Sequence, residues 1–163
     1  MLATDSVRSE ITVSRWLDVV HAAPEFAARV EALFQARKHK TLATLRSDGS
    51  PRISGTETQF EQGDLWMGMM ADSLKARDLR RDARLALHSP SVDAPPGNDA
   101  GWAGEAKIAG RGEFVQRADA TDDAGVVRVD ITEVVITSLD PTADHLVIES
   151  WHPERGFEVR TRK

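Results

Sequence analysis

The N-terminal third of the chain carries a helical pattern of apolar residues. Pro24 suits the first position of a helix. Apolar residues then recur at the spacing of one helical face, at Phe26, Val30, Leu33 and Phe34. The pattern predicts a helix over 24–37. A shorter helix before His21 would present an apolar face made of Trp16, Leu17 and Val20.

Beyond residue 40 the pattern changes to one typical of strands, and Asp48-Gly49 is a strong hairpin signal. Strands are predicted at 41–46, 51–60, 64–70, 85–88, 105–115, 127–138, 145–151 and 156–162. A helix capped by Asp72 or Ser73 is predicted at about 73–82. Residues 91–104 are rich in Pro and Gly and predict a loop. Seven or eight strands with interspersed helices indicate a closed antiparallel barrel with helical additions.

Composition narrows the class of protein. A chain of 163 residues, 40% hydrophobic and 29% charged, is typical of one soluble globular domain. The net charge of −5 argues against general nucleic-acid binding, and the absence of cysteine excludes a disulfide scaffold and a thiol nucleophile. No apolar run approaches the ~20 residues of a membrane span. No secretory signal is apparent, and we expect a cytoplasmic protein.

Two basic elements indicate a site for a phosphorylated ligand. Arg52 and Ser54 share one face of a predicted strand. Lys75 lies in the first turn of the predicted helix 73–82, where the helix macrodipole disfavours a cation. A bound anion would resolve that conflict. The alternative is a solvated basic face, in which Arg77 and its neighbours pair with Asp78 and Asp82.

Other residues are open to more than one interpretation. Trp66 alternates with Leu65 and Met67 and is expected in the core, whereas Trp102 and Trp151 are candidates to line a flat ligand or a partner surface. Gly110-Arg111-Gly112 lies within a strand pattern and indicates a β-bulge. The histidines show no metal-ligand spacing, so no metal site is predicted.

An ordered set of short motifs resembles the pyridoxamine 5′-phosphate oxidase-like superfamily of flavin-binding split barrels. The motifs are Leu42-Ala43-Thr44-Leu45, Asp48-Gly49-Ser50-Pro51, Arg52-Ile53-Ser54, Leu65-Trp66-Met67-Gly68 and Ser73-x-Lys75-x-x-x-Leu79-x-x-Asp82-x-Arg84. The match covers residues 25–115 well. The basic run from Lys75 to Arg84 is similar to the actinobacterial branch of that superfamily.

The resemblance implies a mainly β fold: a six-stranded antiparallel split β-barrel with Greek-key connections and flanking helices. It places the flavin-binding domain at 24–163, after an N-terminal extension at 1–23. It also implies a homodimer with flavin mononucleotide (FMN), or the related deazaflavin coenzyme F-420, in clefts at the dimer interface.

The cofactor-binding residues that the resemblance indicates lie on the strand after the glycine turn and on the basic helix. They are Arg52, Ile53, Ser54, Ser73, Lys75 and Arg77. Leu74 replaces an arginine of the family motif, and Glu57 stands where the oxidase has a phosphate-binding lysine. No catalytic residue is indicated, because the cofactor would hold the reactive ring.

The implied function is hydride transfer, through a flavin-type cofactor, to or from an unidentified small molecule. True pyridoxamine phosphate oxidase activity is not expected, because the oxidase's C-terminal arginine motif has no clear match. A flavin-binding or sensing dimer without turnover is the first alternative. A split barrel that dimerises and binds no cofactor is the second.

Overall fold

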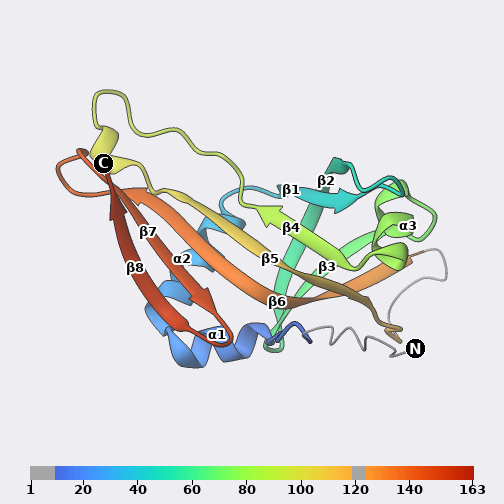
Figure 1. The fold of residues 1–163 in the computed structure, drawn as a ribbon. Coiled ribbons are helices and arrows are strands. Elements are labelled where there is room, and N and C mark those ends of the chain that lie inside the picture. Colours follow the sequence, from blue (N-terminus) through green and yellow to red (C-terminus); the bar gives the residue numbers. More distant parts are fainter. Residues whose placement is uncertain (1–9, 119–123) are drawn as a thin grey trace, which may run out of the picture.

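The computed structural model describes residues 10–118 and 124–163, and its elements follow the predicted order (Figure 1). The helices are α1 (Trp16–Ala22), α2 (Pro24–Gln35) and α3 (Leu74–Arg81), with a short 3₁₀ turn at Asp99–Gly101. The strands are β1 (His39–Leu45), β2 (Pro51–Glu61), β3 (Asp64–Met70), β4 (Arg84–His88), β5 (Glu105–Phe114), β6 (Ala124–Leu139), β7 (Leu146–His152) and β8 (Gly156–Arg162). The eight predicted strands are therefore confirmed.

The first six strands close into an antiparallel barrel. They pair in the order β3-β2-β1-β4-β5-β6, and β3 pairs back to β6. Leu42, Leu65, Leu87 and Ile108 are fully buried inside. Their strands alternate between interior and outer faces, as a two-residue period requires. The predicted mainly β split barrel with flanking helices is confirmed.

Strand β6 is long enough to belong to two parts of the sheet. Its first half pairs with β3, from Ala124 to Val129, and its second half pairs with β7, from Val134 to Leu139. We call Val134–Leu139 together with β7 and β8 the arm. The β5–β6 register shifts between Ala109 and Gly110, which confirms the predicted bulge. Such a bulge bends a strand and increases its twist.

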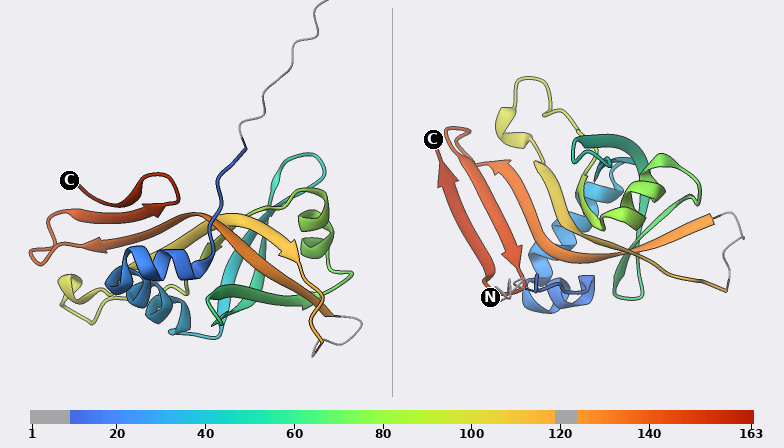
Figure 2. Two further views of the ribbon diagram at one scale, coloured as in Figure 1. Left: turned by 90° about the horizontal axis from the view of Figure 1, so that it is seen from below. Right: turned by 45° about the vertical axis from the view of Figure 1, so that its right-hand side comes forward.

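Helices α1 and α2 pack against the arm side of the molecule, away from α3 (Figures 1 and 2). Val30 and Phe34 of α2 are fully buried, and the Phe26 ring lies 5.1 Å from that of Phe157 in β8. Trp16 and Val19 of α1 belong to the same core, while Leu17 is 44% exposed. The apolar face of α1 is therefore not the predicted one, because Val19 replaces Leu17 on it.

Helix α3 lies at the other end of the barrel, beside β1 and β2. The Ser73 hydroxyl caps it by accepting a hydrogen bond from the Ala76 amide at 3.3 Å. Ala76 and Leu79 are its buried apolar residues. Within the described ranges no helix is long and apolar enough to cross a membrane.

Candidate functional site

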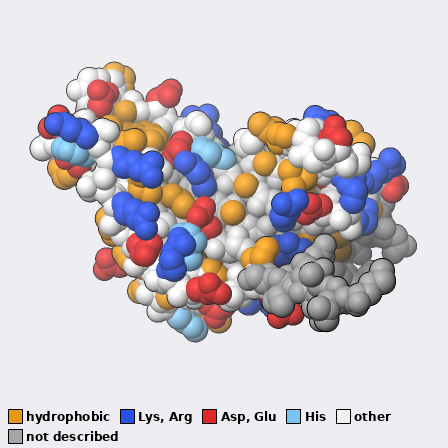
Figure 3. Space-filling view, in the orientation of Figure 1, with side chains coloured by type: hydrophobic (Ala, Val, Ile, Leu, Met, Phe, Trp, Pro, Cys, Tyr) orange, Lys and Arg blue, Asp and Glu red, His pale blue; other side chains and the backbone are white. Residues whose placement is uncertain are grey.

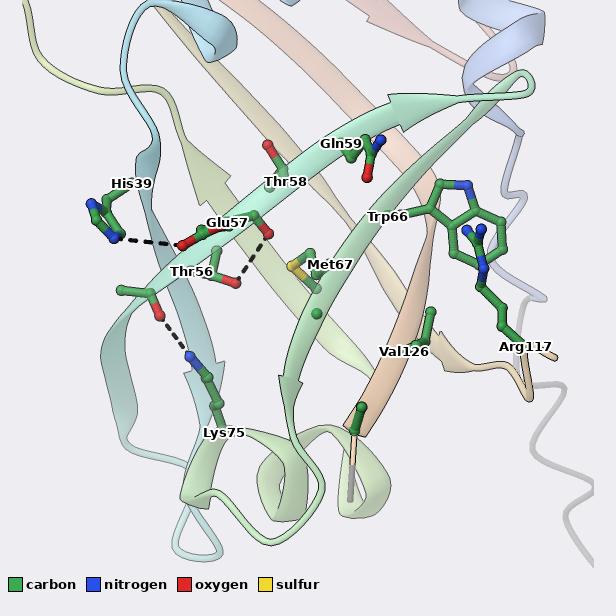
Figure 4. A pocket seen from close by; sticks show the side chains of 13 residues that line it. His39, Thr56, Glu57, Thr58, Gln59, Trp66, Met67, Lys75, Arg117 and Val126 are labelled. Carbon is green, nitrogen blue, oxygen red and sulfur yellow. Dashed lines mark hydrogen bonds and ion pairs between the residues drawn. The ribbon is translucent and has the colours of Figure 1, made fainter. Parts of the chain in front are cut away.

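A groove of about 870 Å³ runs along the β2–β3 side of the barrel, within the size range of small-molecule sites (Figure 4). Residues of β2, β3, β6 and α3 contribute most of its lining. The lining residues are His39, Gly55, Thr56, Glu57, Thr58, Gln59, Trp66, Met67, Gly68, Lys75, Arg117, Ala124 and Val126.

Strand register explains why these residues meet. Glu57 of β2, Gly68 of β3 and Val126 of β6 are partners in one row across three strands. Because side chains alternate between the two faces of a sheet, Gly55 and Trp66 lie on the same outer face as that row. The groove is therefore a surface of the barrel wall, outside the packed interior.

Two glycines give the groove a bare floor. A Cβ atom added at Gly55 or at Gly68 would meet no heavy atom within 4 Å. Side chains at these positions would project into open space above the sheet. Their absence leaves backbone exposed, so a flat group can approach the sheet closely. This floor fits a planar ring such as that of a flavin.

An aromatic ring bounds one end of the groove. The Arg117 guanidinium lies 5.2 Å from the Trp66 ring centroid, in cation–π geometry, and forms an ion pair with Glu61 at 3.5 Å. The indole N–H of Trp66 donates to the Glu61 carbonyl oxygen at 3.3 Å. These contacts hold the Trp66 ring in place beside the floor.

Charged groups occupy the other parts of the lining. The Lys75 ammonium donates a hydrogen bond to the Gly55 carbonyl oxygen at 2.6 Å, which brings the cation to the floor of the groove (Figure 4). The Glu57 carboxylate lies 3.3 Å from the Lys38 ammonium and 3.7 Å from the His39 ring. The acid that stands in place of the family's lysine therefore lies in the groove beside two basic side chains.

Arg52 lies in a buried ion-pair network behind the groove and is not part of its lining. Its Nε donates to Asp78 Oδ2 at 2.7 Å. Arg81 donates to Asp78 Oδ1 at 2.9 Å, and the Thr44 hydroxyl donates to Oδ2 at 2.8 Å. Burial alone would raise the pKa of Asp78, but these hydrogen bonds outweigh it and hold the pKa at about 2. The network fastens α3 to β1 and β2.

The other predicted ligands are spread around this site. Ser54 is half-buried on the face of β2 that carries Arg52, whereas Ile53 is 75% exposed on the outer face. Ser73 is the N-cap of α3, and Arg77 is exposed. Of the six predicted residues, all within the described part of the chain, Lys75 alone lines the groove. The predicted pairing of Asp78 and Asp82 with arginines is confirmed.

The tryptophans are placed differently from the sequence-based interpretation. Trp66 lines the groove, so its assignment to the core is wrong. Trp151 is 4% exposed within the core, so its assignment to a ligand or partner surface is wrong as well. Trp102 lines a smaller pocket that is formed largely by residues of the 91–104 loop. In the sequence, the residue that could have indicated an open face on β3 is Gly68, which follows Trp66 by two positions and so lies on the same face.

Sequence comparisons return no match, since neither a protein-family model nor a curated protein matches this chain. Solved structures do match it. A pyridoxamine 5′-phosphate oxidase-related, FMN-binding protein from Nostoc punctiforme is 10% identical. That match covers 88% of this chain and 96% of that protein, with a TM-score of 0.59.

Two further structures extend the comparison. General Stress Protein 26 from Bacillus anthracis is 10% identical, with 67% of this chain and 91% of that one covered and a TM-score of 0.53. A heme-binding protein from Mycobacterium smegmatis is 15% identical, with 82% and 87% covered and a TM-score of 0.51. The chain thus has the split-barrel fold of the pyridoxamine 5′-phosphate oxidase-like proteins, as its motifs predicted. The actinobacterial branch stays a prediction.

Proposed function

We propose that this protein is a cytoplasmic oxidoreductase that uses a flavin-type cofactor to transfer hydride to or from a small molecule. The observation that carries the proposal is the bare glycine floor of the groove, set between the Lys75 ammonium and the Trp66 ring. An FMN-binding protein with the same fold supports it. FMN is the preferred cofactor, and the deazaflavin coenzyme is the alternative.

Each part of the groove has a role in this proposal. Gly55 and Gly68 give the ring space to lie against the sheet, and Trp66 bounds it at one end. Lys75 donates charge-assisted hydrogen bonds to a phosphate. When bound, the cofactor supplies the hydride chemistry, and the chain supplies position and electrostatics. Arg52 acts on the phosphate only if it exchanges Asp78 for the ligand.

We propose also that two copies of the chain enclose the cofactor. Large apolar side chains are exposed around the groove: Ile53 on β2 is 75% exposed, Met70 on β3 is 75% exposed and Leu74 at the start of α3 is 56% exposed. Exposed apolar surface of this kind marks association sites. A second copy would cover these three side chains and exclude water from the groove.

Titration of the purified apoprotein with FMN, deazaflavin coenzyme and hemin tests the proposal, with hemin included because a heme-binding protein shares the fold. Submicromolar FMN binding is expected. The Lys75→Ala variant should bind about 5- to 150-fold more weakly, since a hydrogen bond to a charged group contributes roughly 1–3 kcal/mol. Lys107→Ala is the matched control, because Lys107 pairs with Glu105 on β5 and does not line the groove.

Four results would contradict parts of this proposal. Binding of hemin alone would reject a flavin-type cofactor, and equal affinities for the wild type and Lys75→Ala would reject the phosphate assignment. Tight FMN binding without cofactor turnover across a broad substrate set would favour the sensing alternative. A light-scattering mass equal to one chain at micromolar concentration, with cofactor present, would reject the enclosing dimer.

A further inference from the structure

The arm ends in an unpaired strand at the side of the molecule remote from the groove. Strand β8 is the last strand of the eight-stranded sheet and pairs with β7 on one side. Within the described residues no strand lies on its other side. Its free edge presents backbone N–H and C=O groups that can pair with another strand. Figures 1 and 2 show this edge at the opposite end from α3.

The apolar residues of β8 lie on one face and are incompletely covered. Phe157 packs on Phe26 of α2, yet it remains 42% exposed. Val159 lies on the same face by the two-residue period and is 55% exposed. A strand added beside β8 would cover both side chains and extend the layer that already packs on α2.

The charged residues of β8 lie on the opposite face and carry both signs. Glu158 is half-buried and lies 3.5 Å from Arg160 and 3.7 Å from Arg155. Arg160 and Arg162 are exposed. Basic and acidic side chains are interspersed over the arm, with hydrophobic surface between them (Figure 3). A strand edge protected only by repulsion would carry charges of one sign.

These residues are complementary to a second copy of the same strand. When two β8 strands run antiparallel with Val159 opposite Val159, each Glu158 lies opposite Arg160 of the other copy. Phe157 then lies opposite Thr161. This register places two opposite-charge pairs on one face and apolar contact on the other, which are the cross-strand pairs that stabilise sheets.

We propose that two copies of this protein associate through their β8 edges, in antiparallel register about Val159, to form a continuous sheet across the interface. The interface is separate from the apolar surface around the groove, and it does not depend on the proposed cofactor. Since each contact is isologous, a protein that uses both would form assemblies larger than a dimer: a closed tetramer where the two twofold axes cross at right angles, and an open chain where they do not.

Charge exchange at positions 158 and 160 tests the register, with the mass measured by sedimentation over a concentration series. Glu158→Arg places like charges opposite each other, as does Arg160→Glu. Each should weaken the β8 association about tenfold or more. The double variant Glu158→Arg/Arg160→Glu should restore it. Arg162→Glu is the matched control, because it makes the same charge change on the same strand but faces Gly156 in this register.

The groove interface is removed separately with Ile53→Asp/Met70→Asp. In that background the protein should still form dimers that respond to the charge exchange, and the amides of 156–162 should exchange hydrogen more slowly as concentration rises. If the mass in that background equals one chain, or the dimer is insensitive to both Glu158→Arg and Arg160→Glu, the β8 interface is rejected. That result would leave the groove proposal intact, and loss of the groove interface alone would leave this one intact.

Discussion

Around α3 a buried carboxylate joins three elements by hydrogen bonds, whereas on the arm apolar side chains hold the strands against a helix. Asp78, which is 4% exposed on its side chain, receives hydrogen bonds from β1, β2 and α3. On the arm, Trp151 and Ile136 are buried, and the ion pair of Arg29 with Glu149 lies near the surface.

The two regions maintain their geometry by different means. A buried ion pair is directional, and it keeps its partners in one arrangement only while all of them are present. Such a network suits the region that must hold Lys75 and the groove floor in register. Apolar packing is less directional, and it suits an arm whose task in this fold is to cover α1 and α2.

The largest expected effect comes from breaking the buried network. Asp78→Ala leaves Arg52 without its carboxylate partner in a poorly hydrated site. We expect a loss of about 3–5 kcal/mol in the free energy of unfolding, the usual result of removing one partner of a buried pair. Urea unfolding followed by tryptophan fluorescence measures it.

The arm provides the matched control for that variant. Glu149→Ala breaks a pair of similar length, 2.7 Å, whose Arg29 side chain is 48% exposed. Water can solvate Arg29, so the expected loss is about 1 kcal/mol or less. Equal losses in the two variants would show that the two regions do not differ in the way that the burial of Asp78 and the exposure of Arg29 indicate.

Acid should distinguish the same two regions. The pKa of Asp78 is held at about 2, below its usual 3.8, so its stabilising effect is complete above the usual value and is lost as pH falls toward 2. Wild-type thermal stability should therefore fall between about pH 4 and pH 2. The fall should be smaller in Asp78→Ala than in the wild type. Parallel curves for the wild type and Asp78→Ala would contradict the assignment.

The fold was predictable from sequence because its signals are local. The Asp48-Gly49 turn, the Ser73 cap and the spacing of Phe26 and Val30 each depend on a few neighbouring residues, and all three are confirmed. The pairing of β3 with β6 was not readable from periodicity, since it joins segments about 60 residues apart. The division of β6 between β3 and β7 depends on that same long-range pairing, so it was not readable either.

The site was harder to predict, because contacts distant in sequence determine which faces are open. Arg52 was expected in the groove, but Asp78, 26 residues later, holds its side chain. The run from Leu65 to Met70 is nearly all apolar, so it gave no alternation from which the outward position of Trp66 could be inferred. The two-residue period puts Trp66 and Gly68 on one face, but only their register with β2 and β6 shows that this face is the outer one.

Replacement of glycines on the strands should affect the free energy of unfolding less than Asp78→Ala does, and by amounts that differ between positions. A Cβ at Gly110 would lie 2.2 Å from the Asp130 carbonyl oxygen, at the bulge where the barrel leads into the arm. Gly110→Ala should therefore lose about 1–3 kcal/mol of stability, the usual cost of overpacking. Gly68→Ala should cost much less, because its Cβ would meet nothing within 4 Å. Urea unfolding of both variants compares them.

Gly68 should matter for ligand binding, whereas Gly110 should not. Gly68→Val places a branched side chain on the groove floor, where a flat ring would otherwise contact backbone. We expect at least about tenfold weaker cofactor binding, near 1.4 kcal/mol, with little loss of stability. Fluorescence titration with FMN measures it. Unchanged affinity would show that the ring does not lie over Gly68.

The smallest expected effect concerns the one carboxylate in the described groove lining. Glu57 lies beside Lys38 and His39, so its charge is partly compensated there, and its side chain is exposed to water. Replacement by glutamine removes a negative charge near the proposed phosphate while preserving shape. Anionic cofactor should then bind about two- to fivefold more tightly at low salt, and the gain should shrink as ionic strength rises, because exposed charges are screened. Titrations of the wild type and Glu57→Gln at two salt concentrations measure this gain. Weaker binding in Glu57→Gln would show that Glu57 holds Lys38 and His39 in position for the ligand, and that its charge does not repel the phosphate.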